Sequence, residues 1–265
     1  MEELPPILES SPDPPPPAMS LAARLLNVFA IPGEVFEVVK TSRISIGNWL
    51  VPMFLLAILG SLTAVAILAQ PVIQRQMREG FDQQVKALDQ QVKAGKLKQA
   101  DADRTVALTR LILAPPTLNV LGAGVAAVIS AARVFWWAFV LWLLGRMLLK
   151  ARLSYFKTLE VAGLALMISA LGGVVALLLM VNLPRLFAAP GLPLPVNDLE
   201  AIRKSPLLLA VLNIFSFWLV GVLSSGLARL AQVPFLRAAW LVLAFWVIQE
   251  SIVVFFGGLL GQFTL

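Results

Sequence analysis

The chain has 265 residues, of which 59% are hydrophobic and 14% charged, and its mean hydropathy of +0.85 excludes an ordinary water-soluble globular protein and indicates one surrounded by lipid. It contains no His and no Cys, which excludes disulfides, Cys/His zinc sites, thiol nucleophiles and imidazole bases. The net charge of +6, without a long basic run, favours contact with anionic lipid headgroups over nucleic-acid binding.

The N-terminal part of the chain is predicted to form a tail and an amphipathic entry. Residues 1–18 hold seven of the eighteen prolines, and because proline lacks an N–H and favours polyproline II, we predict a disordered tail that is a spacer or a docking motif. Ser20 is a suitable N-cap for a helix over 21–31, and a second helix fits 33–41. Both are too short to span a bilayer, so residues 19–47 lie in the headgroup layer or pack on a cytosolic loop.

Five apolar stretches are long enough to cross a bilayer, which takes about 20 residues. Every backbone amide in hydrocarbon must be hydrogen-bonded within its own segment, so all five are predicted to be helical. The sequence therefore predicts an all-α polytopic membrane protein, with a membrane domain over residues 48–265. The predicted spans are 49–69, 118–149, 159–183, 206–228 and 238–262.

A polar region over residues 72–113 separates the first two spans. Apolar residues recur there at spacings of four and three, the stripe of an amphipathic helix, and Gly95 interrupts the pattern before a second helix over 97–113. We predict a polar helical hairpin that packs on itself, on a second copy or on the membrane surface. The stripe consists of Met77, Phe81, Val85, Leu88 and Val92.

Loop charges favour one orientation of the five spans. An odd number of spans places the two termini on opposite sides, and cytoplasmic loops carry an excess of Lys and Arg. With the hairpin set aside, nine basic residues lie on the N-terminal side and three on the other, so we expect a cytoplasmic N-terminus and an extracytoplasmic C-terminus. The nine are Arg24, Lys40, Arg43, Arg146, Lys150, Arg152, Lys157, Arg229 and Arg237; the three are Arg185, Arg203 and Lys204.

Two charged residues interrupt the apolar spans, Arg133 in the second and Glu250 in the fifth. A charge at membrane depth costs about 2.5–3.5 kcal/mol on insertion scales and usually faces a partner or a water-filled cavity. Each lies thirteen residues from a basic residue at the cytoplasmic side, Arg146 or Arg237, so at about 1.5 Å per residue both lie roughly 20 Å from that boundary. We predict an intramembrane ion pair, as a contact between helices or as part of a substrate or proton path; an Arg133 that reaches the outer surface is the third alternative.

Small and polar residues within the spans predict helix contacts. Pairs of small residues at four-residue spacing let helix backbones approach closely, and we predict that they pack helices together. Asn213 and Gln249 are candidates for interhelical hydrogen bonds or for the lining of a polar pocket. The small residues are Gly122 with Ala126, Gly172 with Gly173, Gly221 with Ser225, and Gly257 with Gly261.

No group of residues predicts catalysis. The segment Ser224–Ser225–Gly226 lacks an imidazole base, and Gly95–Lys96 lacks the glycine spacing and the preceding strand of a phosphate loop. We expect no enzymatic activity, no metal and no cofactor. The expected partners are membrane lipids, together with a protein partner or a second copy of the chain.

Several stretches of the chain combine into a recognisable pattern. Residues 24–32 join an amphipathic segment to a proline, residues 151–163 join a short loop to a span entry, and residues 212–227 with 237–240 form a span, a turn and the next span entry. Over residues 20–262 the chain resembles the Ypt-interacting protein (Yip) domain family. The resemblance implies a five-helix membrane domain with a cytosolic N-terminus. The chain lacks the family's eukaryotic Asp-Leu-Tyr-Gly-Pro motif and has a long hairpin, so it looks like a bacterial-type member of an inner membrane.

The resemblance and the residues together define the functional hypotheses. Eukaryotic members of the family bind prenylated Rab-type GTPases in vesicle traffic, whereas bacterial members are largely without an assigned activity. Our first hypothesis is a non-enzymatic membrane organiser or adaptor in trafficking or envelope organisation. A small transporter or channel subunit using Arg133 and Glu250 is the alternative, although no inverted repeat is visible. A protein that perturbs lipid through its entry helices is a third hypothesis.

Overall fold

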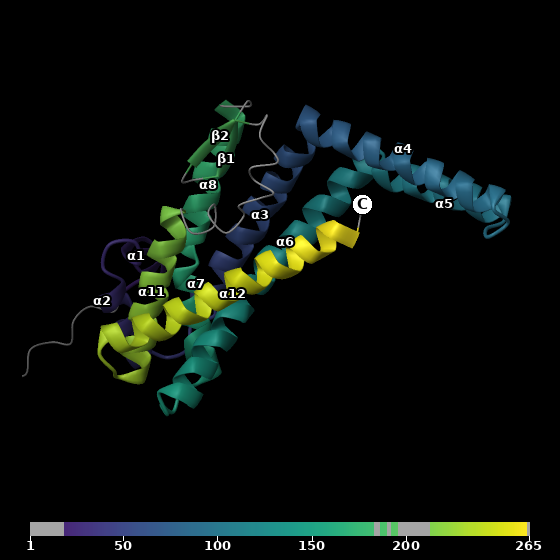
Figure 1. The fold of residues 1–265 in the computed structure, drawn as a ribbon. Coiled ribbons are helices and arrows are strands. Elements are labelled where there is room, and N and C mark those ends of the chain that lie inside the picture. The colour runs from purple at the N-terminus through teal and green to yellow at the C-terminus, as the bar shows by residue number, and fades with distance from the viewer. Residues whose placement is uncertain (1–18, 183–185, 190–191, 196–212, 264–265) are drawn as a thin grey trace, which may run out of the picture.

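The computed structural model describes residues 19–182, 186–189, 192–195 and 213–263 (Figure 1). The predicted tail over residues 1–18 lies outside this part of the chain. Five of the helices are long and apolar enough to cross a membrane, which confirms the prediction of an all-α polytopic membrane protein.

Two short helices, α1 (Leu21–Asn27) and α2 (Pro32–Thr41), form the amphipathic entry. Ser20 caps α1 as predicted, because its Oγ accepts a hydrogen bond from the Ala23 N–H at 3.2 Å. The first helix ends four residues earlier than expected. Residue Ile31, which precedes Pro32, has a non-helical backbone (φ −130°, ψ 56°), as residues before proline often do.

The entry helices pack on the membrane bundle. Val35, Phe36 and Val39 form the apolar face of α2 and are fully buried, where α2 contacts α11 and α7. The apolar face of α2 therefore covers spanning helices of the bundle. Whether the entry lies at the level of the headgroups stays a prediction.

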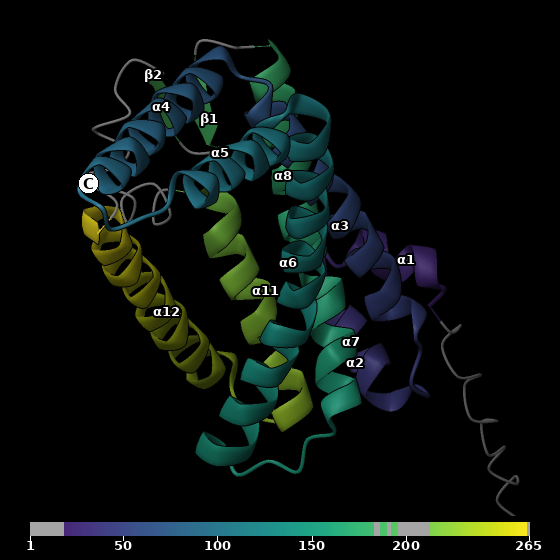
Figure 2. The ribbon, with the colours of Figure 1, turned by 90° about the vertical axis from the view of Figure 1, so that its right-hand side faces the viewer.

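The first two spanning helices run side by side (Figure 2). A bend at Leu166 divides the third span into two helices, and the second span ends in a π-helical turn, Leu144–Leu148. The third span begins at Tyr155, four residues before the predicted start. The spanning helices are α3 (Gly47–Leu68), α6 (Pro115–Leu143), α7 (Tyr155–Ala165) with α8 (Met167–Asn182), α11 (Ile214–Ala231) and α12 (Phe235–Phe263).

Helices α4 (Pro71–Lys93) and α5 (Gln99–Leu113) form the predicted polar hairpin. They contact each other and extend away from the bundle (Figure 1). The turn between them requires Gly95, whose φ of +69° is a conformation that L side chains rarely adopt. The hairpin meets the bundle at the ends of α3 and α6, because these are the helices that it connects.

A short antiparallel pair of strands follows the third span. Strand β1 (Leu186–Ala189) pairs with β2 (Leu192–Pro195), and Leu186 lies opposite Pro195. No pattern in the sequence predicted these two strands. Four residues in each strand are too few to change the fold class.

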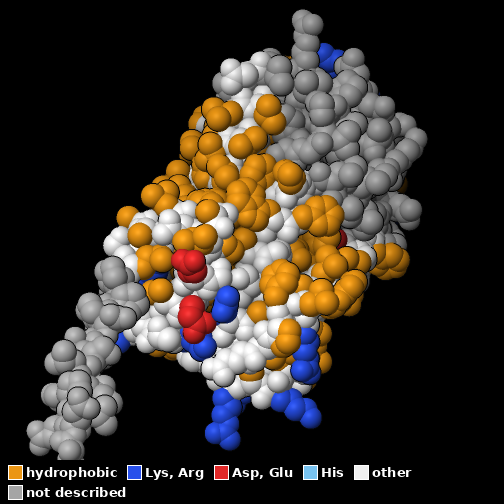
Figure 3. All heavy atoms as spheres, turned by 90° about the vertical axis from the view of Figure 1, so that its left-hand side faces the viewer, with side chains coloured by type: hydrophobic (Ala, Val, Ile, Leu, Met, Phe, Trp, Pro, Cys, Tyr) orange, Lys and Arg blue, Asp and Glu red, His pale blue; other side chains and the backbone are white. Residues whose placement is uncertain are grey.

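The core lies where the entry meets the bundle. Its largest fully buried side chains include Phe36 of α2, Leu141 of α6, Leu159 of α7 and Leu223 of α11. Elsewhere the spanning helices expose large apolar side chains. Figure 3 shows hydrophobic side chains over the body of the molecule and basic side chains gathered at its lower end, which is the surface expected of a protein in lipid.

Candidate functional site

A buried carboxylate, Glu160, lies in the second turn of α7. The residue has no exposed surface. Its Oε1 accepts hydrogen bonds from the Ser45 backbone N–H at 2.7 Å and from Asn48 Nδ2 at 2.8 Å. A buried charge is costly unless it is paired and hydrogen-bonded, and these two donors connect it to the start of α3.

Lys157 lies one turn before Glu160 and supplies the counter-charge. Its Nζ lies 2.9 Å from Glu160 Oε2. The same ammonium donates hydrogen bonds to the Val39 carbonyl at 2.6 Å and to the Ser42 carbonyl at 2.8 Å. Oε2 accepts no hydrogen bond from the described residues, so its contact with Lys157 is ionic. Because Val39 and Ser42 end α2, Lys157 connects α2 to α7 and complements the negative end of the α2 dipole.

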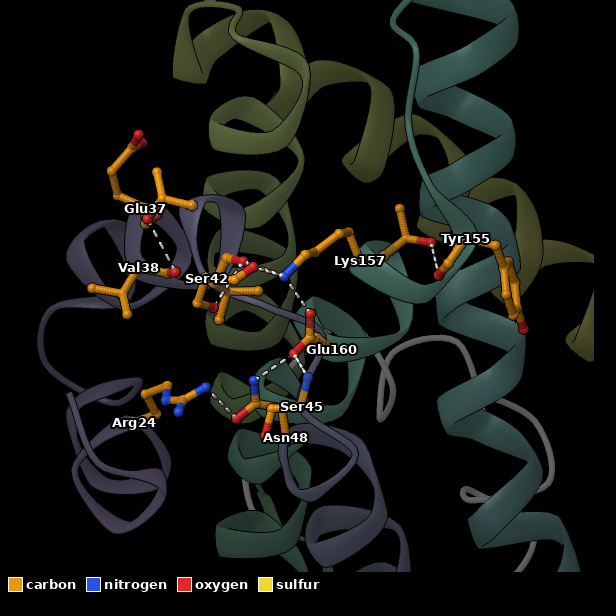
Figure 4. A network of polar contacts seen from close by, with 12 residues as sticks. Arg24, Glu37, Val38, Ser42, Ser45, Asn48, Tyr155, Lys157 and Glu160 are labelled. Atoms are coloured by element: carbon orange, nitrogen blue, oxygen red, sulfur yellow. Dashed lines mark hydrogen bonds and ion pairs between the residues drawn. The ribbon is translucent and has the colours of Figure 1, made fainter. Parts of the chain in front are cut away.

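Arg24 extends the network to α1. Its Nη1 donates to Asn48 Oδ1 at 3.0 Å and its Nε donates to the Met19 carbonyl at 3.1 Å. The resulting Glu160 network connects both entry helices, the start of α3 and α7 (Figure 4). Its members come from four separate parts of the chain, so the network fixes where the entry lies on the bundle.

The sequence analysis did not single out Glu160. The predicted third span begins at residue 159, so Glu160 falls at its first turn, where a charged residue is ordinary. Two signals could have found it: the Lys157 and Glu160 pair at helical spacing, and Asn48 in the first turn of an apolar span. Neither signal identifies the partner, because Asn48 and Glu160 are 112 residues apart.

Arg133 and Glu250 line one cavity of about 330 Å³ within the membrane bundle. Arg133 comes from α6 and Glu250 from α12. Both residues are among those the structure describes, and no nitrogen of Arg133 lies within 4.0 Å of a Glu250 oxygen. The structure thus places the two charges around the same space without direct contact, and the ion pair stays a prediction.

Two polar residues singled out in the sequence line the same cavity. Gln249 Oε1 accepts a hydrogen bond from Trp136 Nε1 at 2.7 Å, which joins α12 to α6. Asn213 instead caps its own helix, because its Oδ1 accepts from the Phe215 N–H at 3.0 Å. Gln249 therefore fits both predicted roles, whereas Asn213 fits only the pocket.

Close helix contacts occur at predicted glycines and at others. A β-carbon at Gly122 would lie 2.7 Å from Leu68 Cδ1, and one at Gly172 would lie 3.0 Å from Phe215 Cγ. A β-carbon at Gly163 would lie 2.7 Å from the Asn48 carbonyl oxygen, and one at Gly226 would collide with Val161 Cγ1. A β-carbon at Gly221 would meet nothing within 4 Å among the described residues, so the predicted contact there stays a prediction. Ser225 faces α2, with its Oγ 3.8 Å from a β-carbon placed on Gly33. The side chains at Gly257 and Gly261 lie outside the described part of the structure.

These observations define a multi-pass helical membrane protein with its amphipathic entry packed on the bundle. The described part of the chain holds no group of three or more His, Cys, Asp or Glu that could bind a metal ion. The family model of the Yip1 domain matches residues 26–257. The chain belongs to the Yip1 domain family, and the resemblance drawn from its sequence is confirmed. Searches of curated proteins and of solved structures give no match.

Proposed function

We propose that this Yip1-domain protein is a non-enzymatic adaptor of a bacterial inner membrane that presents a fixed cytoplasmic surface to a protein partner. The Glu160 network carries the proposal. A buried polar network that holds two short helices against a bundle fixes the position of their outer face. An adaptor needs such a fixed face, because a pre-positioned surface loses less entropy when it binds.

The proposed docking surface is a groove of about 710 Å³ beside α2 and the turn between α11 and α12. Glu37 lies 2.9 Å from Lys40 and 3.9 Å from Arg229, and Phe235 supplies an exposed aromatic ring. Arginine and aromatic side chains are enriched in protein interfaces. Figure 3 shows acidic and basic side chains beside hydrophobic ones on the face that carries α1 and α2.

Photo-crosslinking from the groove tests the adaptor function. Gln232 lines the groove and is exposed, so a photoreactive residue there should capture one specific protein in native membranes. The same probe at Leu121, an exposed apolar position of α6, is the control for contact with neighbouring membrane proteins. The charge exchange Glu37→Lys with Lys40→Glu and Arg229→Glu keeps both ion pairs with their signs reversed but should abolish the capture. Equal capture from both positions, or capture that survives the exchange, contradicts the proposal.

A truncation that tests the N-terminal tail must end at residue 18 and leave both entry helices in place. Val28, Val35 and Phe36 are fully buried, so removal of residues 1–47 would open the core and lose binding through unfolding. Removal of residues 1–18 leaves these side chains in place. It therefore tests whether the proline-rich tail contributes to capture from Gln232.

A transporter or channel subunit is the second candidate, and the cavity of Arg133 and Glu250 favours it. We propose that Arg133 and Glu250 contact the transported ion or lipid through their opposite charges in this cavity. Flux of ions or labelled lipids into proteoliposomes should then fall for Glu250→Gln. It should be unchanged for Glu37→Gln, a carboxylate outside the cavity. Absence of flux in the unaltered protein, or equal flux in both variants, removes this candidate.

A further inference from the structure

A second cavity, of about 470 Å³, lies where the hairpin meets the bundle. It is bounded by the end of α3, by α4, by the end of α5 and by the start of α6. Leu68, Phe81 and Leu113 contribute to its apolar wall, and Arg78 and Arg110 are the charged residues of its described lining, which includes no Asp or Glu. The cavity thus combines an apolar wall with two positive charges.

The two arginines have donors available for a ligand. Arg78 Nε donates to the Gln74 carbonyl at 3.3 Å, but its terminal nitrogens have no partner among the described residues. The Arg110 side chain makes no hydrogen bond within the described structure. Neither arginine lies within 4.0 Å of a carboxylate of the described residues. Guanidinium groups bind phosphate through paired hydrogen bonds, so two of them beside one cavity fit a phosphate group.

The position of the cavity identifies the kind of molecule that reaches it. Leu68 ends the first span and Pro115 begins the second, so the cavity lies at the boundary between hydrocarbon and headgroups. Exposed apolar side chains continue from it along α5 and α6, among them Leu111 and Val120. A ligand at this level has its phosphate near the arginines and its chains among lipid tails.

We propose that this cavity binds one anionic phospholipid, such as phosphatidylglycerol, with its phosphate at Arg78 and Arg110 and an acyl chain against Phe81 and Leu113. The net charge of the headgroup follows from the described lining of the cavity, which supplies two cations and no anion. A zwitterionic headgroup would bring an ammonium group to a site with no carboxylate to receive it. The site lies at the hairpin end of the spans, so the proposal goes beyond the adaptor function and does not depend on it.

Lipid retention by the full-length protein tests the proposal. The protein is placed in phosphatidylcholine nanodiscs containing a small share of phosphatidylglycerol, and bound lipid is measured by native mass spectrometry. We expect selective retention of phosphatidylglycerol, and about tenfold weaker retention for each arginine removed in the Arg78→Gln and Arg110→Gln variants. Arg78→Lys with Arg110→Lys keeps the charge but loses the paired hydrogen bonds, and should give an intermediate loss.

A matched variant separates a site from general charge attraction. Lys86→Gln with Arg104→Gln removes two exposed basic residues of the same hairpin that do not line the cavity, and should retain phosphatidylglycerol fully. A loss in Lys86→Gln with Arg104→Gln equal to that in Arg78→Gln with Arg110→Gln overturns the proposal, and so does equal retention of phosphatidylcholine. Hairpin-to-hairpin crosslinking that depends on Arg78 and Arg110 would assign the cavity to a second copy and also overturns it. Capture from Gln232 should not change in any of these variants, so the adaptor and the lipid site fail separately.

Discussion

Two Lys–Glu pairs in this protein have the same spacing and distance, with the two residues in opposite order, but different surroundings. Lys157–Glu160 and Lys40–Glu37 are both three residues apart, with nitrogen and oxygen at 2.9 Å. The Glu160 side chain is completely buried, whereas 43% of the Glu37 side chain is exposed. Water screens the exposed pair, and solvates Glu37 when its partner is removed. Glu160 has no access to water and depends on its protein partners.

We expect Lys157→Met to lower the free energy of unfolding by about 3–5 kcal/mol, because it leaves Glu160 buried without its counter-charge. Lys40→Met removes the pair of the same spacing and distance from the surface and should cost less than about 1 kcal/mol. Unfolding of both variants in mixed detergent micelles measures the difference. Equal losses would show that Glu160 does not depend on Lys157.

Helix α7 lies unusually close to the start of α3 at Gly163. The nearest atoms to a β-carbon there belong to the backbone and side chain of Trp49 and to the Asn48 carbonyl. Backbone atoms cannot move aside as a flexible side chain can. The close approach also positions Asn48 against Glu160, so helix packing and the polar network depend on the same contact.

We expect Gly163→Ala to destabilise the protein by about 1–3 kcal/mol, because the added methyl group forces α3 and α7 apart. Gly221→Ala is the matched control, since its methyl group would enter open space. Alanine also favours a helix over glycine, so this change should be neutral or stabilising by up to about 1 kcal/mol. Thermal unfolding in detergent compares the two. A loss of stability at Gly221 equal to that at Gly163 would contradict this account of the contacts.

The elements predictable from sequence are those that a local pattern defines. Apolar runs define the spans, and the stripe that includes Phe81 and Val85 defines the hairpin, because both signals lie within one segment. The contacts of Glu160 and Gly163 depend on residues more than a hundred positions away, and no local period records them. Gly221 illustrates the converse: its spacing is typical of a helix contact, but no described residue lies within 4 Å of a β-carbon placed there.

The five spans contribute unequally to the bundle. Half of the most apolar 18-residue stretch of α7–α8 is buried inside the structure. The corresponding share is 11% in α3 and 17% in α12. The third span is therefore the central helix, and the residues that fix the entry, Lys157 and Glu160, lie on it. The first and fifth spans, α3 and α12, leave most of this stretch outside the core, where lipid can cover it. The proposed docking groove and the proposed lipid cavity lie at opposite ends of this bundle.

An odd number of spans requires that the two ends of the chain lie on opposite sides of the membrane. Because the chain contains no cysteine, single substitutions can be labelled with a membrane-impermeant maleimide without further changes. We expect Ser10→Cys and Lys150→Cys to react from the cytoplasm, and Gln84→Cys in the hairpin and Leu265→Cys to react from the other side. Lys150 and Gln84 are exposed and act as internal references for the two sides. Labelling of Ser10→Cys and Leu265→Cys from the same side would require an even number of crossings, and would place one of the five helices within one leaflet or outside the membrane.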